Sequence, residues 1–116
     1  MLNQVVLVGR LVKEPILQKT DKNKQFMLIT LAIPRSFKNS VGEYETDFVD
    51  CILWDGVAKS TSEYCHKADI VGVKGRIQSR NVEDNDGNKK YYTDIIAERV
   101  TFLSTKGEDG SKKVTN

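Results

Sequence analysis

The sequence has few of the features that mark membrane, secreted or metal-binding proteins. No apolar run approaches the roughly 20 residues that cross a bilayer, and the start MLNQVVLVGR has neither a basic n-region nor a small-residue cleavage site. The cysteines, Cys51 and Cys65, lie far from any CxxC spacing, and His66 is the single histidine. We therefore expect a cytoplasmic protein with free thiols, no metal site and no cofactor.

An excess of charge of either sign is also missing, because 18 Lys and Arg oppose 16 Asp and Glu. A net charge of +2 does not by itself indicate a polyanionic ligand, so that argument depends on where the charges lie. The 39% of hydrophobic residues is ordinary for a folded chain of this length. We expect one domain over 1–104, and a flexible tail over 105–116, where the sequence is polar and aperiodic.

Five stretches have the pattern of β-strands: residues 3–12, 24–33, 45–54, 69–80 and 91–103. The first two are apolar at odd and even positions, which predicts burial on both faces, inside a barrel or at a subunit interface. In the third, period 2 directs Val49, Cys51 and Leu53 toward the core. Asp86-Gly87 predicts a two-residue hairpin between the last two stretches.

Between the third and fourth stretches, GVAKSTSEYCHK predicts a short helix with Asp55 as its N-cap. Its apolar stripe comprises Val57, Ala58, Thr61, Tyr64 and Cys65. The resulting class is all-β with one helix, in the order three strands, helix, two strands. This is the order of the OB-fold, a five-stranded partly open Greek-key barrel that commonly binds oligonucleotides or oligosaccharides.

Three aromatic residues are candidates for ligand contact. Phe48 and Trp54 share strand parity, so their rings point the same way about 20 Å apart. They suit stacking platforms for separate nucleotides, or they fill a core or an interface. Phe37 lies between Arg35 and Lys38 in an expected polar loop, where a large ring either packs locally or meets a ligand.

Lys74, Arg76 and Arg80 share one face of the fourth stretch and form a basic stripe. Such a stripe neutralises phosphates or is simply a solvated face. Tyr91 and Tyr92 point to opposite faces, so we expect one ring to pack inward and the other outward.

Groups for catalysis are scarce, since His66 has no matched nucleophile and no Gly-rich phosphate cradle is present. Several acids could hold a divalent metal as in a nuclease, but turn and surface roles explain them better: Glu45, Asp47, Asp50, Glu83, Asp84 and Asp86. We expect no enzymatic activity.

Four segments in order, MLNQVVLVGRLVKEP, ITLAIPRSF, YETDFVDCILW and VGVKGRIQSRN before a DG hairpin, resemble the bacterial single-stranded DNA-binding protein family. The resemblance implies an OB-fold homotetramer with DNA wrapped around it. It implies pairing of first strands at a subunit interface through Val5, Val6, Leu7 and Val8. By position, the stacking rings are Phe37, Phe48 and Trp54, and the phosphate contacts are Arg10, Arg35, Lys67, Lys74, Arg76 and Arg80.

The sequence departs from that family in two places. Val82 stands where the family commonly carries another aromatic ring. Loss of one platform costs on the order of 1–3 kcal/mol, which predicts weaker binding or a different site size unless Tyr91 compensates. The family's acidic tip, which recruits replication and repair enzymes, is not matched by the weakly basic end KGEDGSKKVTN, so that recruitment is not expected.

The predicted function is sequence-tolerant binding and protection of single-stranded DNA in replication, recombination, repair or DNA uptake. The expected location is the cytoplasm, in association with the nucleoid. The alternatives are a primosome-type accessory OB protein, an OB module for RNA or oligosaccharide, a metal-dependent nuclease and a purely structural oligomer.

Overall fold

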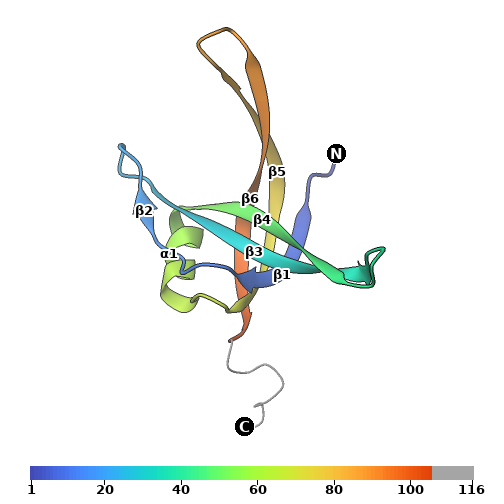
Figure 1. The fold of residues 1–116 in the computed structure, drawn as a ribbon. Helices are drawn as coiled ribbons and strands as arrows, with labels where there is room; N and C mark the ends of the chain where they lie inside the picture. Colours follow the sequence, from blue (N-terminus) through green and yellow to red (C-terminus); the bar gives the residue numbers. More distant parts are fainter. Residues whose placement is uncertain (106–116) are drawn as a thin grey trace.

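The computed structural model describes residues 1–105 of the chain. These residues form, in order, β1 (Val5–Leu11), β2 (Gln18–Lys19), β3 (Gln25–Lys38), β4 (Tyr44–Trp54), α1 (Asp55–Tyr64), β5 (Ile70–Glu83) and β6 (Lys89–Ser104) (Figure 1). Apart from the two-residue β2, this is the predicted order. The predicted tail lies, except for Thr105, outside the described residues. No helix of residues 1–105 is long and apolar enough to span a membrane.

The strands close into a ring in the order β1, β5, β6, β4, β3, and β3 pairs back to β1 (Figure 1). Long antiparallel ladders join β3 to β4 and β5 to β6. Two short seams complete the ring. At one, Arg10 and Leu11 of β1 pair with β3, and at the other, Cys51 and Ile52 of β4 pair in parallel with β6. The prediction of a five-stranded OB barrel is confirmed.

Alternate residues of the strands fill the barrel. Cys51 and Leu53 are fully buried and Val49 is partly buried, as period 2 predicts. Gly75 is required where β5 passes β6, since a Cβ there would lie 2.2 Å from the carbonyl oxygen of Ile96. On the outer faces, Val6 and Val8 of β1 and Leu28 of β3 are exposed in the single chain, so the predicted burial of both faces would need a subunit interface.

Helix α1 packs against β3, β4 and β6. Ala58 and Thr61 are buried on it and Cys65 is buried just after it, but Tyr64 is exposed because it lies beyond the edge of the packed stripe. The prediction of Asp55 as N-cap is wrong. Trp54 is the N-cap, with extended backbone and no capping hydrogen bond from its side chain, and Asp55 is the first residue of α1, with a φ of +50°.

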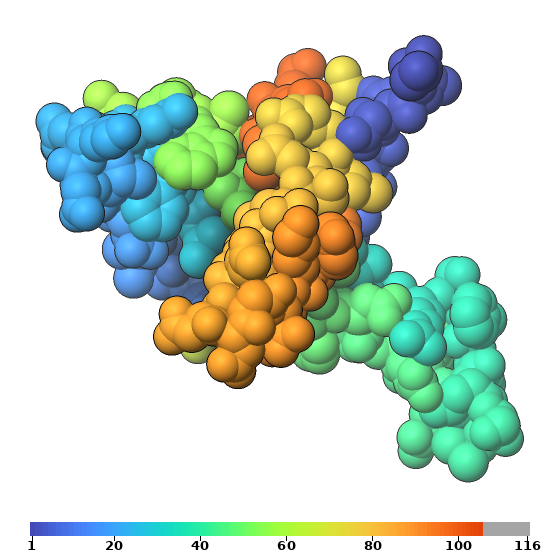
Figure 2. Space-filling view, turned by 90° about the horizontal axis from the view of Figure 1, so that it is seen from above, coloured from blue at the N-terminus to red at the C-terminus, as the bar shows by residue number. Residues whose placement is uncertain are grey.

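Two hairpins project beyond the barrel in different directions (Figures 1 and 2). We call them the β3–β4 arm (residues 34–47) and the β5–β6 arm (residues 78–94). The segment expected as a polar loop around Phe37 is strand in the first arm, because β3 continues to Lys38. Its polar side chains can face solvent on both sides, and the pairing with β4 is interrupted by a bulge between Pro34 and Lys38 before it resumes at Lys38 and Tyr44.

The tip of the β5–β6 arm differs from the predicted two-residue turn. Asp84 and Asn88 are the last hydrogen-bonded pair, which leaves a three-residue loop over 85–87. Gly87 adopts φ +83°, in the third loop position where such hairpins need a left-handed residue. The Asp84 carboxylate accepts the backbone N–H groups of Asp86 and Asn88, so this acid serves the turn.

Candidate nucleic-acid interface

The outer face of β3 and β4 carries a row of aromatic and apolar side chains. Phe48, Asp50, Ile52 and Trp54 of β4 lie opposite Ala32, Thr30, Leu28 and Phe26 of β3. Phe48 is 67% exposed, and Trp54 is partly buried. Neither ring fills the barrel core, so their shared parity leaves them available to a ligand or to a partner chain.

Neighbouring side chains hold Trp54 in place. The Phe26 ring centroid lies 5.7 Å from that of Trp54, at a tilt of 42°. The Lys24 Nζ lies 4.8 Å from the Trp54 ring centroid and 3.9 Å from the Asp55 carboxylate. These partners were missed by sequence reasoning, because only the register of β3 against β4 brings residues 24–26 to Trp54.

Phe37 is separated from that face. It lies on the β3–β4 arm, where β3 extends beyond the barrel. Its ring is 66% exposed. Tyr44 is a second exposed ring on this arm, with the Lys38 Nζ 5.8 Å from its centroid. Figure 2 shows the arm extending away from the barrel, so Phe37 lacks core contacts.

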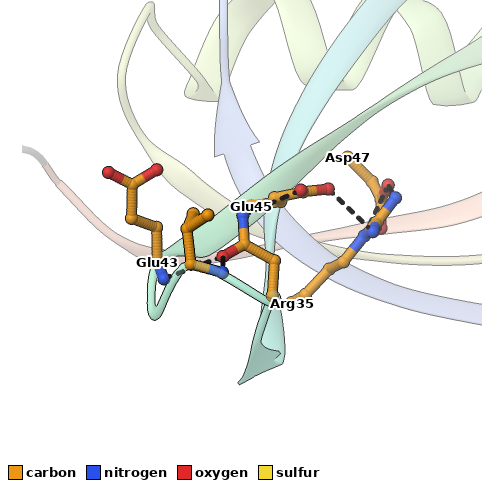
Figure 3. A network of polar contacts seen from close by, with 6 residues as sticks. Arg35, Glu43, Glu45 and Asp47 are labelled. Carbon is orange, nitrogen blue, oxygen red and sulfur yellow. Dashed lines mark hydrogen bonds and ion pairs between the residues drawn. The ribbon is translucent and has the colours of Figure 1, made fainter.

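Arg35 is bound to carboxylates of its own arm (Figure 3). Its Nη2 lies 2.9 Å from Asp47 Oδ1, and its Nη1 lies 2.9 Å from Glu45 Oε1. Asn39 Nδ2 donates to the other Glu45 oxygen at 3.0 Å. The hydrogen bond from Arg35 lowers the pKa of Asp47 below its ordinary value. This predicted phosphate contact is therefore already neutralised within the chain.

The other predicted arginine contacts also have partners. Arg10 Nη1 donates to the Ala68 carbonyl oxygen at 2.7 Å, which joins β1 to the loop before β5. Arg76 Nη1 donates to Gln78 Oε1 at 2.7 Å, and its Nε lies 3.5 Å from Glu98. These side chains would have to exchange a protein acceptor for a phosphate.

The two predicted lysine contacts are exposed and lie in different places. Lys74 lines a hollow of about 160 Å³ on the barrel wall with Val6, Val8 and Arg99. Lys67 follows α1, and its backbone N–H donates to Glu14 Oε1 at 3.0 Å. That bond, together with one from His66, lowers the pKa of Glu14. The basic stripe thus does not form one continuous surface, since Arg80 lines a different hollow.

Arg80 belongs to a groove between the outer face of β3 and β4 and the β5–β6 arm. The groove has a volume of about 410 Å³. Its lining residues come from four strands and from the loop after β1: Lys13, Leu28, Thr30, Asp50, Ile52, Arg80, Tyr92, Thr93 and Asp94. Cationic, acidic and apolar side chains line the groove together. Such a lining suits a flat ligand with polar groups at its edge.

Tyr91 and Tyr92 differ from the expectation of one inward and one outward ring. Both are exposed, because the β5–β6 arm has no core on either face. Tyr92 lines the groove, and the Arg80 guanidinium carbon lies 4.6 Å from its ring centroid. Lys13, Leu28 and Tyr92 are groove residues that sequence reasoning did not select.

The predicted interface strand β1 is divided by its pleat. Val5 and Leu7 are partly buried toward the barrel, whereas Val6 is 71% exposed and Val8 is also exposed. The acids weighed as metal ligands are distributed over both arms and β4. Within residues 1–105, no three His, Cys, Asp or Glu side chains converge to hold a metal ion.

Comparison with known proteins assigns the chain to a family. A model of the single-strand binding protein family matches residues 2–103. The chain is 47% identical over 106 residues to single-stranded DNA-binding protein B of Bacillus subtilis, covering 91% of this chain and 94% of that protein. It is 45% identical over 118 residues to single-stranded DNA-binding protein 3 of Listeria innocua, covering 100% of this chain and 74% of the relative.

A solved structure supports the fold. The chain superposes on the structure described as Plasmodium falciparum SSB complex with ssDNA, with a TM-score of 0.73 and 22% identity. The superposition covers 90% of this chain and 96% of that one. On the family match and the identity to its bacterial relatives, the chain belongs to the single-strand binding protein family.

Proposed function

We propose that this chain binds single-stranded DNA with little regard to sequence and protects it from re-pairing. Membership of the family supports the proposal. The observation that carries it is the placement of Phe48 and Trp54 on one outer face, on either side of a groove that contains Lys13 and Arg80. Exposed rings stack on bases regardless of sequence, while cations beside them hold the backbone.

The site that we propose extends from this face to the β3–β4 arm. Phe37, Phe48 and Trp54 would each stack on a base, and Lys13 would contact a phosphate along the groove. Arg80 would contact a phosphate only through the guanidinium nitrogens that Asp94 leaves free, because its Nε already donates to Asp94. Lys67 and Lys74 are free of ion pairs within residues 1–105 and are available as further contacts. Arg10, Arg35 and Arg76 would contribute only by exchanging their present acceptors.

We propose residues 1–104 as the DNA-binding domain of a homotetramer, with pairing through the open face of β1. Val6 and Val8 support this, because a neighbouring β1 would cover two apolar side chains that the single chain leaves exposed. We place the protein at the nucleoid in the cytoplasm, in replication, recombination, repair or DNA uptake. Members of this family bind DNA without catalysing a reaction, and we propose the same here.

The test is a titration of the protein with oligothymidine at low and high salt, followed by Trp54 fluorescence. We expect quenching that salt weakens, since a base stacks on the single indole and phosphates displace counterions. Phe48→Ala should weaken binding by about 1–3 kcal/mol. The matched control is Tyr64→Ala, which removes an exposed ring of α1 outside the groove.

Three further outcomes distinguish the alternatives. Tighter binding of an RNA oligomer of equal length would favour an RNA-binding module. Cleavage of a labelled strand on adding magnesium would show a nuclease. No change in fluorescence, and none in the anisotropy of a labelled strand at micromolar protein, would favour a structural oligomer or a module for another ligand such as an oligosaccharide.

A further inference from the structure

The groove lies between the two exposed rings of β4. Its floor is formed by Asp50 and Ile52 of β4 with their cross-strand partners Thr30 and Leu28 of β3. These positions fall between Phe48 and Trp54 in the same row of side chains. A DNA strand that stacks on both rings would therefore pass over this floor.

One wall of the groove presents a flat, fixed surface. Arg80 Nε donates to Asp94 Oδ2 at 2.8 Å, and the Asp94 side chain is only 16% exposed. The Arg80 guanidinium carbon lies 4.6 Å from the Tyr92 ring centroid, and Tyr92 is 42% exposed. A guanidinium and a phenol held together in this way form a platform on which a base can stack.

The Asp50 carboxylate on the floor of the groove has no cationic partner within residues 1–105, whereas the Asp94 carboxylate on the wall has one. Arg80 offsets the Asp94 carboxylate, whereas Asp50 has only the Thr30 hydroxyl, which donates to its Oδ1 at 2.6 Å. The second oxygen, Oδ2, accepts no hydrogen bond from residues 1–105. A carboxylate in this position repels phosphate and attracts an N–H donor.

We propose that this groove is a base pocket that selects a base with an exocyclic amino group. The inference depends on the proposed binding of single-stranded DNA. The base would stack against Tyr92 and Arg80, and its amino group would donate to Asp50 Oδ2, as cytosine N4 donates to carboxylates. Thr30 positions the carboxylate, and Lys13 at the rim contacts the phosphate. In the same stacked orientation, thymine or uracil would place the acceptor O4, in place of an amino group, against the same carboxylate.

The pocket gives a preference at one point of a strand that is otherwise bound without regard to sequence. The stacking rings Phe37, Phe48 and Trp54 accept any base, because every base has a π-face. Asp50 is the one carboxylate in the row between Phe48 and Trp54. The preference should therefore depend on this side chain and leave general binding intact.

The test compares oligodeoxycytidine with oligodeoxyuridine of equal length, because these bases differ only at ring positions 3 and 4. Dissociation constants are measured by anisotropy for the wild type and for Asp50→Asn. We expect the preference for cytidine to fall by about fivefold in the variant, as one charged hydrogen bond is lost. Asp86→Asn makes the same charge change at the tip of the arm and should leave the ratio unchanged.

Two more variants test the wall and the positioning of the carboxylate. Tyr92→Leu should weaken both oligomers by about fivefold, since it removes the stacking surface. Thr30→Val keeps the branched shape and the strand propensity but frees the Asp50 carboxylate, so it should lower the cytidine preference without unfolding the protein. Circular dichroism of each variant checks the fold.

The outcomes separate this inference from the proposed function. If both oligomers bind and the ratio is the same in the wild type and in Asp50→Asn, the pocket does not select an amino group, and general DNA binding stands. If the wild type binds neither oligomer, the proposed function itself fails.

Discussion

The Arg35 guanidinium is paired with the Asp47 carboxylate, with 2.9 Å between Nη2 and Oδ1. Glu45 holds a second guanidinium nitrogen, so this cation is neutralised twice over before DNA arrives. To bind Arg35, a phosphate would have to displace the Asp47 carboxylate, which already accepts hydrogen bonds from the guanidinium. A basic residue in this sequence is therefore a phosphate contact only if the fold leaves its charge free.

Lys13→Gln should flatten the salt dependence of DNA binding. The slope of log Kobs against log salt should decrease in magnitude by about 0.7, the value for one phosphate contact on a single strand. Arg35→Gln should change the slope much less, because its carboxylates already neutralise it. Lys59→Gln, at an exposed residue of α1 outside the groove, is the matched control. An equal effect of Arg35→Gln would show that the arm opens to phosphate.

Val82→Trp should strengthen DNA binding. Val82 is an exposed strand residue of the β5–β6 arm, opposite Lys90, so an indole fits without disturbing the core. A gained stacking platform is worth on the order of 1–3 kcal/mol. Ile16→Trp, at an exposed residue between β1 and β2 outside the proposed site, is the control, and equal affinity gains in both variants would mean that position 82 has no special role.

Val6→Asp should dissociate the proposed oligomer. It places a charge on the open apolar face of β1, where a paired strand would leave the carboxylate buried without a partner. Sedimentation velocity should show a smaller species. Ile16→Asp, at an exposed residue between β1 and β2, should leave the assembly unchanged. An intact tetramer in Val6→Asp would require another interface.

Gly75→Ala should destabilise the barrel, whereas Gly56→Ala should not. The new Cβ at position 75 would meet the Ile96 backbone, which cannot move without breaking the ladder between β5 and β6. We expect a loss of about 3 kcal/mol or more in the free energy of unfolding. At Gly56, in the first turn of α1, the space is open, and alanine should add about 0.5–1 kcal/mol. Urea unfolding measures both.

Cys51 should make stability fall at alkaline pH. Burial, with the Asp50 charge adding to it, raises the pKa of this thiol from 9.0 to about 11. A raised pKa in the folded state means that the contribution is complete below pH 9.0 and is lost as the pH rises through about 11. Cys51→Ala should therefore lose less stability across this window, and a parallel loss in both proteins would contradict the assignment.

Local patterns in the sequence predicted the barrel core well. Alternation over residues 45–54 identifies Cys51 and Leu53 as buried, since each residue's side follows from its neighbours alone. The predicted helix stripe correctly identifies Ala58 and Thr61 as buried for the same reason. It is wrong at Tyr64, because the burial of that residue depends on packing against strands distant in sequence. Composition misled at Phe37, because a polar hairpin arm reads like a loop.

The groove could not be predicted, since its residues are brought together only by the closed ring. Leu28 faces Ile52 through the register of β3 and β4, and Tyr92 joins them because β6 lies beside β4. The pairing of Arg35 with Asp47 depends on the length of the β3–β4 arm. Each of these facts involves residues distant in sequence, for which one sequence read alone offers no signal.

The two short seams of the barrel divide it into two half-shells, β3 with β4 and β5 with β1 and β6. Each half-shell carries one arm, and four register pairs join the half-shells at the two seams, with one further backbone hydrogen bond from Val12 to Thr30. The width of the groove between Asp50 and Tyr92 is then set by the most weakly hydrogen-bonded part of the ring. A DNA strand bound to both arms would first strain the backbone pairing between Cys51 and Ile95.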